Sequence, residues 1–490
     1  MYRNRGYCIL LIPFLVLLFG CPELDPEDPD EQGLSERREL EIWWNNPDGD
    51  DVELRVLDID PGEDGKALIY LQDRGNVTMG DASTDSGSVF VKKEDVEFAI
   101  TGLPGGMGII TFTNRAGTKE AKLRVFVRNW NWNKEPAKSN VFRHTLEPDP
   151  VNYPFVEERP DGQGYVGNSS YKNTSWAIYK LILDRGFFYE APDGVSGQGG
   201  VHADKSLENW NRGVHNHPHI LYHPKISDPL EPLGYRYGKD PVLGKTVFAF
   251  VMHYDFDGDM VGGFPDRQRL ELKTMNKTTP PAPYNQGSGD RMFSEGNGDT
   301  FTHRWKFKLP KDFKVSTEYT HIHQIKPEGA DNGNPTFTVT ARKKSNNEEV
   351  LQLIYRGPIR EIIGDREIPS VNWYPAEVPL DPFRGEWIRA EEMVTYDNPG
   401  AYRIKLVRIR DMKVLMEYEY SPETYDEEDP FVMFRKGNTY IRAKYGVYRR
   451  IMHMTPFGLP NKDDPVLEYK REGDEVRVLY TDIEMDKWKY

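Results

Sequence analysis

The chain of 490 residues carries 78 acidic and 63 basic side chains, and its formal net charge is -15 at pH 7. This negative surplus excludes general binding to nucleic acid, although a locally basic surface could still hold an anionic polymer. The length is enough for two or three domains with separate cores. Apolar content is modest while glycine, proline and aromatic residues are abundant, which favours a strand-rich protein over a helical bundle.

Residues 1–20 are typical of a targeting segment. Arg3 and Arg5 precede an apolar run that is too short to span a bilayer comfortably. The run ends in Leu-Phe-Gly-Cys21, which resembles a bacterial lipobox with Cys21 as the lipidated first residue of the mature protein. An ordinary secretory signal is the alternative. Cleavage would remove Cys8 and leave Cys21 as the last thiol, which excludes a disulfide scaffold and cysteine-based chemistry.

Residues 21–38 are acidic and rich in proline, which predicts an extended tether. Acidic residues directly after a lipidated cysteine resemble the surface-export signal of Bacteroidetes lipoproteins, and a plain solvated linker is the alternative. We therefore expect an outer-membrane lipoprotein that is exposed at the cell surface and anchored through a lipid on Cys21.

Residues 39–132 consist of short alternating runs separated by turn signals, which predicts a small immunoglobulin-like β-sandwich. This segment contains no catalytic constellation, so we expect a spacer. Carbohydrate binding is the alternative, because four tryptophans could stack on sugar rings unless they are packed. They are Trp43, Trp44, Trp130 and Trp132. Residues 133–159 are rich in Pro, Asn and Glu and are predicted to form a linker.

Residues 160–490 show strand patterns almost throughout, with weak helical periodicity only near residues 175–184. Ten or more strands follow one another without an alternation of strands and helices. This pattern favours a two-sheet jelly roll, so the predicted fold class is all-β.

Three of these strands carry unusual charge. The alternation of side chains puts Arg267, Arg269, Glu271 and Lys273 on one face of the first strand. The strand at residues 320–327 allows two registers, with either His321 and His323 or Gln324 and Lys326 facing inward. The strand at residues 440–451 has one apolar face, and its other face carries Tyr440, Arg442, Lys444, Gly446, Tyr448 and Arg450. Each strand alone could be a solvated face, but three together suggest a binding groove.

The motifs on these strands resemble those of alginate-lyase-type polysaccharide lyases, in the same order, over residues 160–490. Arg269-Leu-Glu-Leu-Lys273 is similar to their R-x-E-L-R strand, with lysine in place of the last arginine. His321-Ile-His323, or Gln324-Ile-Lys326, resembles their Q-I-H strand. Lys444-Tyr-Gly-Val-Tyr448 resembles their K-x-G-x-Y strand. The Arg-Gln-Arg and His-Gln-Ile-Lys segments are closer to the glucuronan-lyase and heparinase-I-like branch.

The resemblance implies β-elimination at a uronic acid. Arg269 would bind the uronate carboxylate, and Gln324 or His323 would share its negative charge. Tyr448 would protonate the leaving oxygen and could also take the C5 proton, since Lys444 and other cations favour its phenolate form. His323 is the alternative base. Further substrate-binding candidates are His321, Arg267, Glu271, Arg450, His217 and His219.

We expect no required cofactor. The histidines at positions 215, 217, 219 and 223 could bind zinc, but their loop setting favours a role in lining the substrate site. Asp255, Asp257 and Asp259 resemble part of a calcium loop without its distal glutamate, so a turn is the first interpretation and structural calcium the alternative.

The predicted function is that of a surface-tethered polysaccharide lyase acting on an anionic, uronate-containing polymer, with ulvan or glucuronan as the first guess. Alginate and glycosaminoglycans remain open as substrates. Two alternatives are a non-catalytic carbohydrate-binding lipoprotein and a jelly-roll glycoside hydrolase. The hydrolase would need two facing carboxylates, of which Glu271 could be one.

Overall fold

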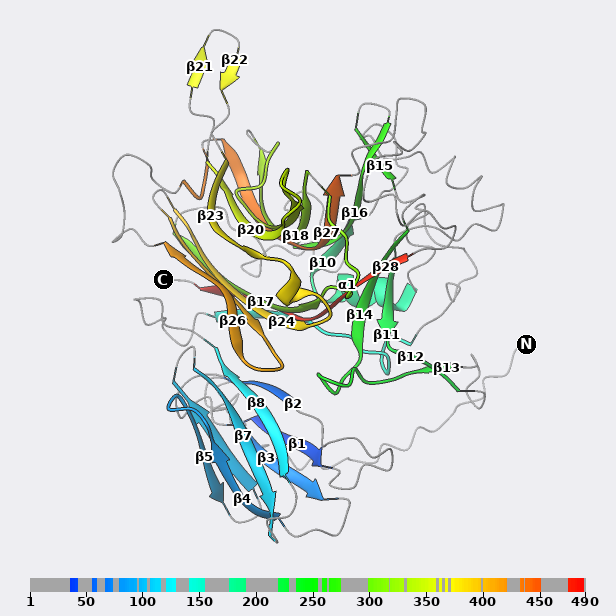
Figure 1. Cartoon of the computed structure of the whole chain (residues 1–490), viewed down its shortest axis with the longest axis vertical. Coiled ribbons are helices and arrows are strands. Elements are labelled where there is room, and N and C mark those ends of the chain that lie inside the picture. The colour runs from blue at the N-terminus through cyan, green and yellow to red at the C-terminus, as the bar shows by residue number, and fades with distance from the viewer. Residues whose placement is uncertain are drawn as a thin grey trace, which may run out of the picture.

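In the part of the chain that the computed structural model describes, nearly all regular elements are strands (Figure 1). It describes residues 36–42, 55–59, 67–73, 79–94, 97–103, 106–115, 120–128, 141–154, 176–190, 219–228, 235–253, 258–261, 264–274, 298–316, 318–329, 333–357, 361–363, 366–368, 372–397, 400–420, 432–435, 437–450 and 475–488. Some predictions lie outside these residues. They concern Cys21, the four tryptophans at positions 43, 44, 130 and 132, His215, His217, Asp255 and Asp257.

The N-terminal strands form a small sandwich of two four-stranded sheets. The first sheet has the order β1(Glu36–Ile42), β3(Ala67–Asp73), β6(Glu97–Gly102) and β5(Val89–Glu94). The second has the order β2(Arg55–Ile59), β8(Glu120–Val127), β7(Met107–Asn114) and β4(Met79–Thr84). Both sheets contribute to one apolar core, in which the rings of Phe98 and Phe112 lie 5.0 Å apart. Two strand pairs are parallel, β1 with β3 and β2 with β8.

A second, larger sandwich contains two eight-stranded sheets, which we call the front sheet and the back sheet. The front sheet has the order β10(Phe187–Glu190), β16(Phe264–Thr274), β27(Asn438–Arg450), β18(Thr320–Gly329), β19(Phe337–Lys343), β20(Glu349–Arg356) and β23(Asn372–Pro379), with β15(Gly258–Val261) beside β16. The back sheet has the order β11(His219–His223), β14(Val247–His253), β28(Glu475–Trp488), β17(Asp299–Lys308), β24(Trp387–Tyr396), β25(Ala401–Arg408) and β26(Lys413–Tyr420), with β9(Val141–Leu146) beside β28.

Few described elements lie outside these sheets. Two short hairpins pair β12(Lys225–Ser227) with β13(Tyr235–Tyr237) and β21(Glu361–Ile363) with β22(Arg366–Ile368). Helix α1(Trp176–Asp184) matches the weak helical periodicity of the sequence, and a 3-10 turn spans Asp381–Phe383. Within the described part of the chain, no helix is both long and apolar enough to cross a membrane.

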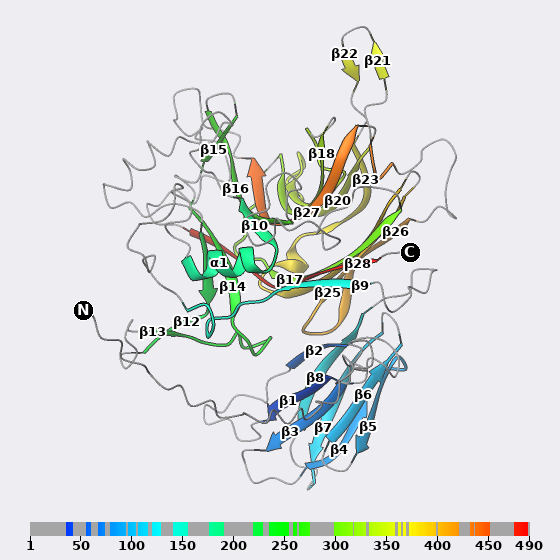
Figure 2. The same cartoon turned by 180° about the vertical axis from the view of Figure 1, so that it is seen from behind.

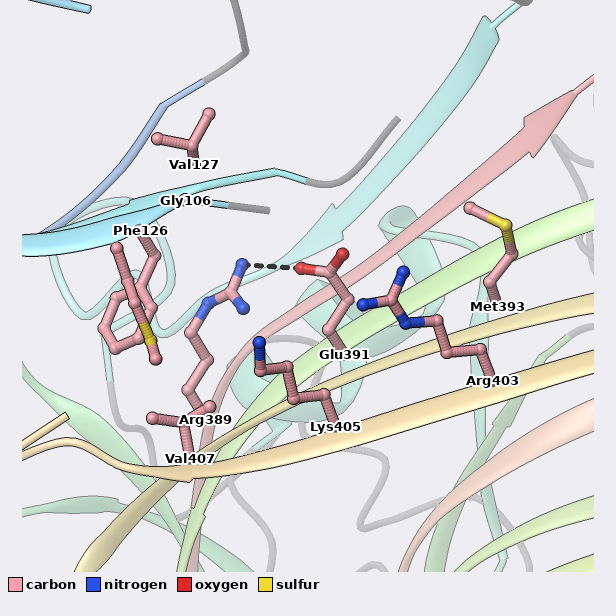
Figure 3. Close-up of a pocket in the computed structure, with 10 residues that line it drawn as sticks. Gly106, Phe126, Val127, Arg389, Glu391, Met393, Arg403, Lys405 and Val407 are labelled. Carbon is pink, nitrogen blue, oxygen red and sulfur yellow. Dashed lines mark hydrogen bonds and ion pairs between the residues drawn. The ribbon is translucent and has the colours of Figure 1, made fainter. Parts of the chain in front are cut away.

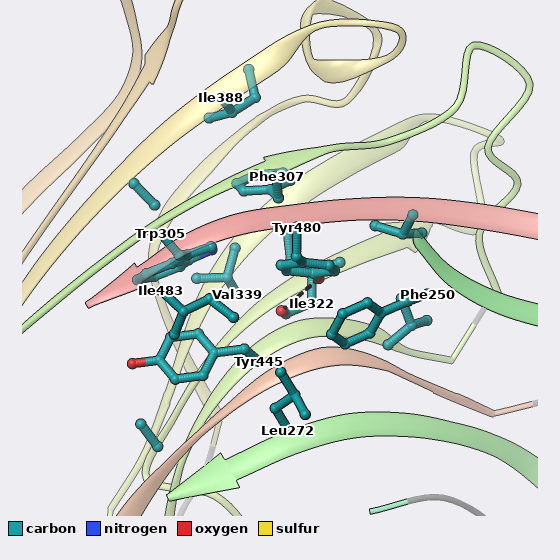
Figure 4. Close-up of a cluster of buried hydrophobic side chains, with 14 of the residues drawn as sticks. Phe250, Leu272, Trp305, Phe307, Ile322, Val339, Ile388, Tyr445, Tyr480 and Ile483 are labelled. Atoms are coloured by element: carbon teal, nitrogen blue, oxygen red, sulfur yellow. Dashed lines mark hydrogen bonds between the residues drawn. The ribbon is translucent and has the colours of Figure 1, made fainter. Parts of the chain in front are cut away.

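The space between front and back sheets is filled with apolar side chains, and Tyr480 is one of its central residues (Figure 4). Its ring lies 4.6 Å from that of Phe250 on the same sheet. Its hydroxyl reaches across to the front sheet and lies 3.0 Å from the carbonyl oxygens of Ile322 and Gly446. Alternating apolar residues of both sheets thus form one interior, and the predicted all-β, jelly-roll fold class is confirmed.

The small sandwich lies against the outer side of the back sheet, and its strand β8 provides part of the contact (Figure 2). A pocket at this junction is lined by Phe126 and Val127 of β8 and by Arg389 and Glu391 of β24 (Figure 3). The Arg389 guanidinium lies 4.7 Å from the centre of the Phe126 ring. Asp58 of β2 forms ion pairs with two cations of the back sheet, Lys306 at 2.6 Å and Arg389 at 2.8 Å. Apolar and ionic contacts therefore both hold the two sandwiches together.

Candidate active site

The outer face of the front sheet carries the residues predicted from the first and third charged strands. Strands β16 and β27 pair with Arg269 opposite Tyr448, Glu271 opposite Gly446 and Lys273 opposite Lys444. The intervening residues of both strands, such as Leu270 and Val447, lie in the core. Because successive side chains of a strand point to opposite faces, the paired polar residues project outward. The Arg269 guanidinium lies over the Tyr448 ring, 4.3 Å from its centre.

The third strand of the site, β18, contains an irregularity that the sequence did not predict. His321 is opposite Tyr448, but His323 is opposite Tyr445, so two residues of β27 face one residue of β18. The pairing of β18 with β19 shifts at the same place. Ile322 and His323 are both buried on the inner side as a result. His321 and Gln324 therefore both belong to the outer face, and each of the two alternative registers is half right.

His323 does not lie with the other predicted catalytic residues, which corrects its expected placement on the groove face. Its Nε2 atom lies 2.8 Å from a carboxylate oxygen of Glu392 in the interior. Its ring stacks on that of Trp305 at 4.3 Å and is 1% exposed. The physical reason is the bulge, which turns one extra side chain of β18 inward. Lys326, from the other register, pairs opposite Arg442 farther along the sheet.

His321 takes the position beside Tyr448 that His323 was expected to occupy. Its ring stacks on Tyr319 at 4.6 Å and lies 5.8 Å from the ring of Tyr448. Its Nδ1 atom lies 2.8 Å from the Thr340 hydroxyl oxygen. Burial, followed by the positive charges of Arg342 and Lys444, lowers the pKa of His321 to about 3. The imidazole is therefore neutral at ordinary pH.

Glu271, Gln324 and Lys444 form a buried polar group next to this pair. The Gln324 amide nitrogen donates a hydrogen bond to one Glu271 carboxylate oxygen, and the Lys444 ammonium lies 3.5 Å from the other. All three side chains are at most 2% exposed, so their geometry is held tightly. Both carboxylate oxygens of Glu271 thus face protein groups, Gln324 and Lys444.

The backbone conformation and close packing of β27 explain why position 446 is a glycine. Its φ is 140°, a conformation that favours glycine. A Cβ atom there would lie 2.2 Å from the Leu270 carbonyl oxygen and 2.7 Å from the Glu271 Cα. The glycine therefore permits the close approach of β16 at the position of the bulge.

The remaining predicted residues are spread along or beyond this face. Arg450 lies near Glu318, with 3.8 Å between nitrogen and oxygen. Arg267 pairs opposite Arg450, and His219 begins β11 in the back sheet. The side chains of Arg267 and His219 are outside the described part of the structure. Asp259 lies in β15 with the same restriction. In the described part of the chain, no group of three or more His, Cys, Asp or Glu side chains could hold a metal ion.

Two residues of the site escaped the sequence analysis. Tyr319 stacks on His321 and lies 5.3 Å from the Tyr448 ring. Thr340 contacts His321 and lies 2.7 Å from Thr338 through the two hydroxyl oxygens. The alternation of threonines in the strand at 336–341 was a usable signal, because it places Thr338 and Thr340 on one face. No comparable pattern marks Tyr319, which precedes its strand.

A comparison of the chain with protein-family models finds no match, and a comparison with curated proteins finds none either. Among solved structures, the alginate lyase from Pseudomonas aeruginosa is similar over 49% of this chain and 82% of its own, with 11% identity and a TM-score of 0.27. The alginate lyase from Klebsiella pneumoniae is similar over 52% and 86%, with 13% identity and a TM-score of 0.29.

A lectin from Bauhinia forficata in complex with GalNAc is similar over 55% of this chain and 92% of its own, with 8% identity and a TM-score of 0.23. Identities and TM-scores as low as these carry no argument about function. The functional conclusion therefore rests on the residues of the front sheet.

Proposed function

We propose that the protein is a polysaccharide lyase that cleaves a uronate-containing polymer by β-elimination. The observation that carries this proposal is the cluster of Tyr448, Arg269 and His321 on one face, formed by three adjacent strands. It brings together a phenol, a guanidinium and a neutral imidazole. These are the acid, the carboxylate ligand and the base that an elimination next to a carboxylate requires.

The uronate carboxylate would bind the Arg269 guanidinium, which can offer two parallel hydrogen bonds and absorb charge as the C5 carbanion develops. His321 would take the C5 proton, since its uncharged ring lies beside Tyr448, with 5.8 Å between the ring centres. The electron pair of the C5–H bond then forms the C4–C5 double bond, and the C4–oxygen bond breaks. Tyr448 would donate its hydroxyl proton to the departing oxygen. One product ends in a new reducing end, which keeps the departing oxygen as its hydroxyl. The other product begins with a 4,5-unsaturated uronate.

We propose ulvan or glucuronan as the first substrates to test, with alginate and heparin as the comparison polymers. A lyase creates unsaturated uronate ends that absorb in the ultraviolet, so absorbance should rise with one or more of these polymers. Reducing ends without ultraviolet absorbance would instead identify a glycoside hydrolase. Retention of a polymer without either product would identify a binding protein, and both results would contradict the lyase proposal.

We further propose that the enzyme acts at the cell surface, anchored to the outer membrane by a lipid on Cys21. The lipobox-like Leu-Phe-Gly-Cys21 and the acidic residues after it support this proposal. Cys21→Ala should abolish metabolic labelling by a fatty acid and release the chain from the membrane fraction. Equal labelling of the variant and the parent chain would contradict the assignment of Cys21. Exposure at the surface should make the parent chain accessible to added protease in intact cells.

A further inference from the structure

The outer face of the front sheet continues beyond the candidate active site onto strands β19, β20 and β23. His321 pairs opposite Thr340 of β19, and Thr340 pairs opposite Gln352 of β20. Gln352 in turn pairs opposite Glu377 of β23. These outer-face positions form a row that crosses the strands, with about 4.8 Å between neighbours. A polymer held at Tyr448 and lying across the strands would pass over them.

Arg342, two residues beyond Thr340 on β19, differs from the other basic side chains of this region. Lys344 pairs with Glu377 at 2.8 Å, Lys444 lies 3.5 Å from Glu271, and Arg442 pairs with Glu328. By contrast, the described part of the structure shows no ion pair of Arg342, although its positive charge contributes to lowering the pKa of Glu377. Its Nε atom is buried without a hydrogen-bond partner there. An arginine in this state retains its capacity to bind an anion.

Two neighbouring groups complement Arg342. Tyr374 of β23 is 41% exposed, and the Arg342 guanidinium lies 6.0 Å from the centre of its ring. The Arg342 Nη1 atom lies 3.5 Å from the Tyr374 hydroxyl oxygen. Gln352 is 4% exposed, and its side-chain oxygen has no hydrogen-bond partner in the described structure. An anion ligand, a flat ring and a hydrogen-bond acceptor are what a charged sugar with free hydroxyls would contact.

We infer that Arg342, Tyr374 and Gln352 form a second subsite, which binds an acidic sugar unit of the polymer away from the bond that is cleaved. This inference rests on the proposed lyase function for its substrate class. Arg342 would bind a carboxylate or a sulfate ester, Tyr374 would stack on the sugar ring, and Gln352 would accept a hydrogen bond from a hydroxyl. The subsite adds affinity for long chains and does not contact the bond that is cleaved.

The test is binding of polymers by the Tyr448→Phe protein, in which cleavage should be slow, measured by affinity electrophoresis at low salt. Adding Arg342→Gln should weaken binding of the preferred polymer roughly ten- to hundredfold, as expected for the loss of a hydrogen-bonded charge pair. Arg403→Gln is the matched control, because Arg403 is a half-buried arginine on the back sheet that lies 3.3 Å from Glu417. Equal weakening by both substitutions would overturn the inference.

Kinetics on defined oligosaccharides provide the second readout. In the active protein, Tyr374→Ala should raise KM for long chains and leave kcat unchanged, while the shortest cleaved oligosaccharide is unaffected. A fall in kcat of Tyr374→Ala on that shortest substrate would overturn the inference, since Tyr374 would then contribute to the chemical step. Arg342→Gln should also show which anion is bound. A larger loss of binding affinity for ulvan, which carries sulfate esters, than for glucuronan would identify sulfate as the preferred anion. Equal loss of affinity for the two polymers would identify the carboxylate.

The lyase proposal and the subsite can fail separately. Binding of an anionic polymer that depends on Arg342, without formation of unsaturated ends, would refute the lyase and support the subsite. Unsaturated ends formed by a protein whose binding is indifferent to Arg342 and Tyr374 would support the lyase and refute the subsite.

Discussion

Tyr448→Phe should lower kcat on the cleaved polymer by roughly 10²–10⁴-fold, the usual contribution of a positioned acid or base. The substitution removes one hydroxyl and keeps the ring, so the contact with the Arg269 guanidinium at 4.3 Å should persist. KM should change little, because the hydroxyl acts mainly on the oxygen that departs in the transition state. Initial rates of ultraviolet absorbance, measured with equal amounts of folded protein, provide the result.

Tyr440→Phe is the matched control for this prediction. Tyr440 lies on the same strand and the same face as Tyr448 but pairs opposite Glu328, far along the sheet from His321. Loss of its hydroxyl should leave kcat within about twofold of the parent enzyme. Full activity of Tyr448→Phe would contradict the assignment of Tyr448, and an equal loss in both variants would show that the effect is structural.

Asp58→Ala should have the largest effect on stability among the charged residues of the junction. The Asp58 carboxylate lies 2.6 Å from Lys306 and 2.8 Å from Arg389. Both cations are at most 5% exposed. Removal of one partner from a buried ionic group leaves uncompensated charge and typically costs about 3–5 kcal/mol. Asp482 remains beside Lys306 at 2.5 Å, which places the expected loss at the lower end of that range.

Thermal unfolding followed by calorimetry would measure this loss. We expect the small sandwich of Asp58→Ala to separate from the back sheet and to unfold in a transition of its own. Glu120→Ala is the matched control, because Glu120 is exposed on β8 of the same small sandwich. The thermal unfolding midpoint of Glu120→Ala should stay within a degree or two of that of the parent chain. An Asp58→Ala variant that unfolds like the control would show that the apolar contacts alone hold the junction.

The same residues predict how the junction responds to acid. Burial opposes ionisation of Asp58, but Lys306 and Arg389 outweigh it and hold the pKa of this carboxyl well below its usual value. For Asp482, Lys245 and Lys306 likewise outweigh burial and lower the pKa to about 2. Carboxyls with lowered pKa values stabilise the folded state above their unfolded value, near ~3.9, and lose that contribution as the pH falls. Wild-type stability should therefore drop between about pH 4 and pH 2, and this drop should be smaller in Asp58→Ala.

The strand patterns were sufficient for the fold class and for much of the candidate site. Alternation placed Arg269 and Glu271 on one face of β16 and Lys444 and Tyr448 on one face of β27, and both placements hold in the structure. These predictions succeeded because a regular strand has a side-chain period of two, and the period can be counted in the sequence. The same reasoning failed on β18, where Ile322 and His323 both point inward.

The sequence by itself determined the all-β architecture and the residue types available for chemistry, because both follow from local periodicity and composition. Only the tertiary structure decided which histidine stands beside Tyr448. That choice depends on the bulge, on the conformation of Gly446 and on the Tyr480 hydroxyl, 3.0 Å from the Ile322 and Gly446 carbonyl oxygens. It likewise decided that Asp58 meets Lys306 across 248 residues of chain. Pairings between distant strands are set by packing and hydrogen bonding in the folded state, which no local pattern encodes.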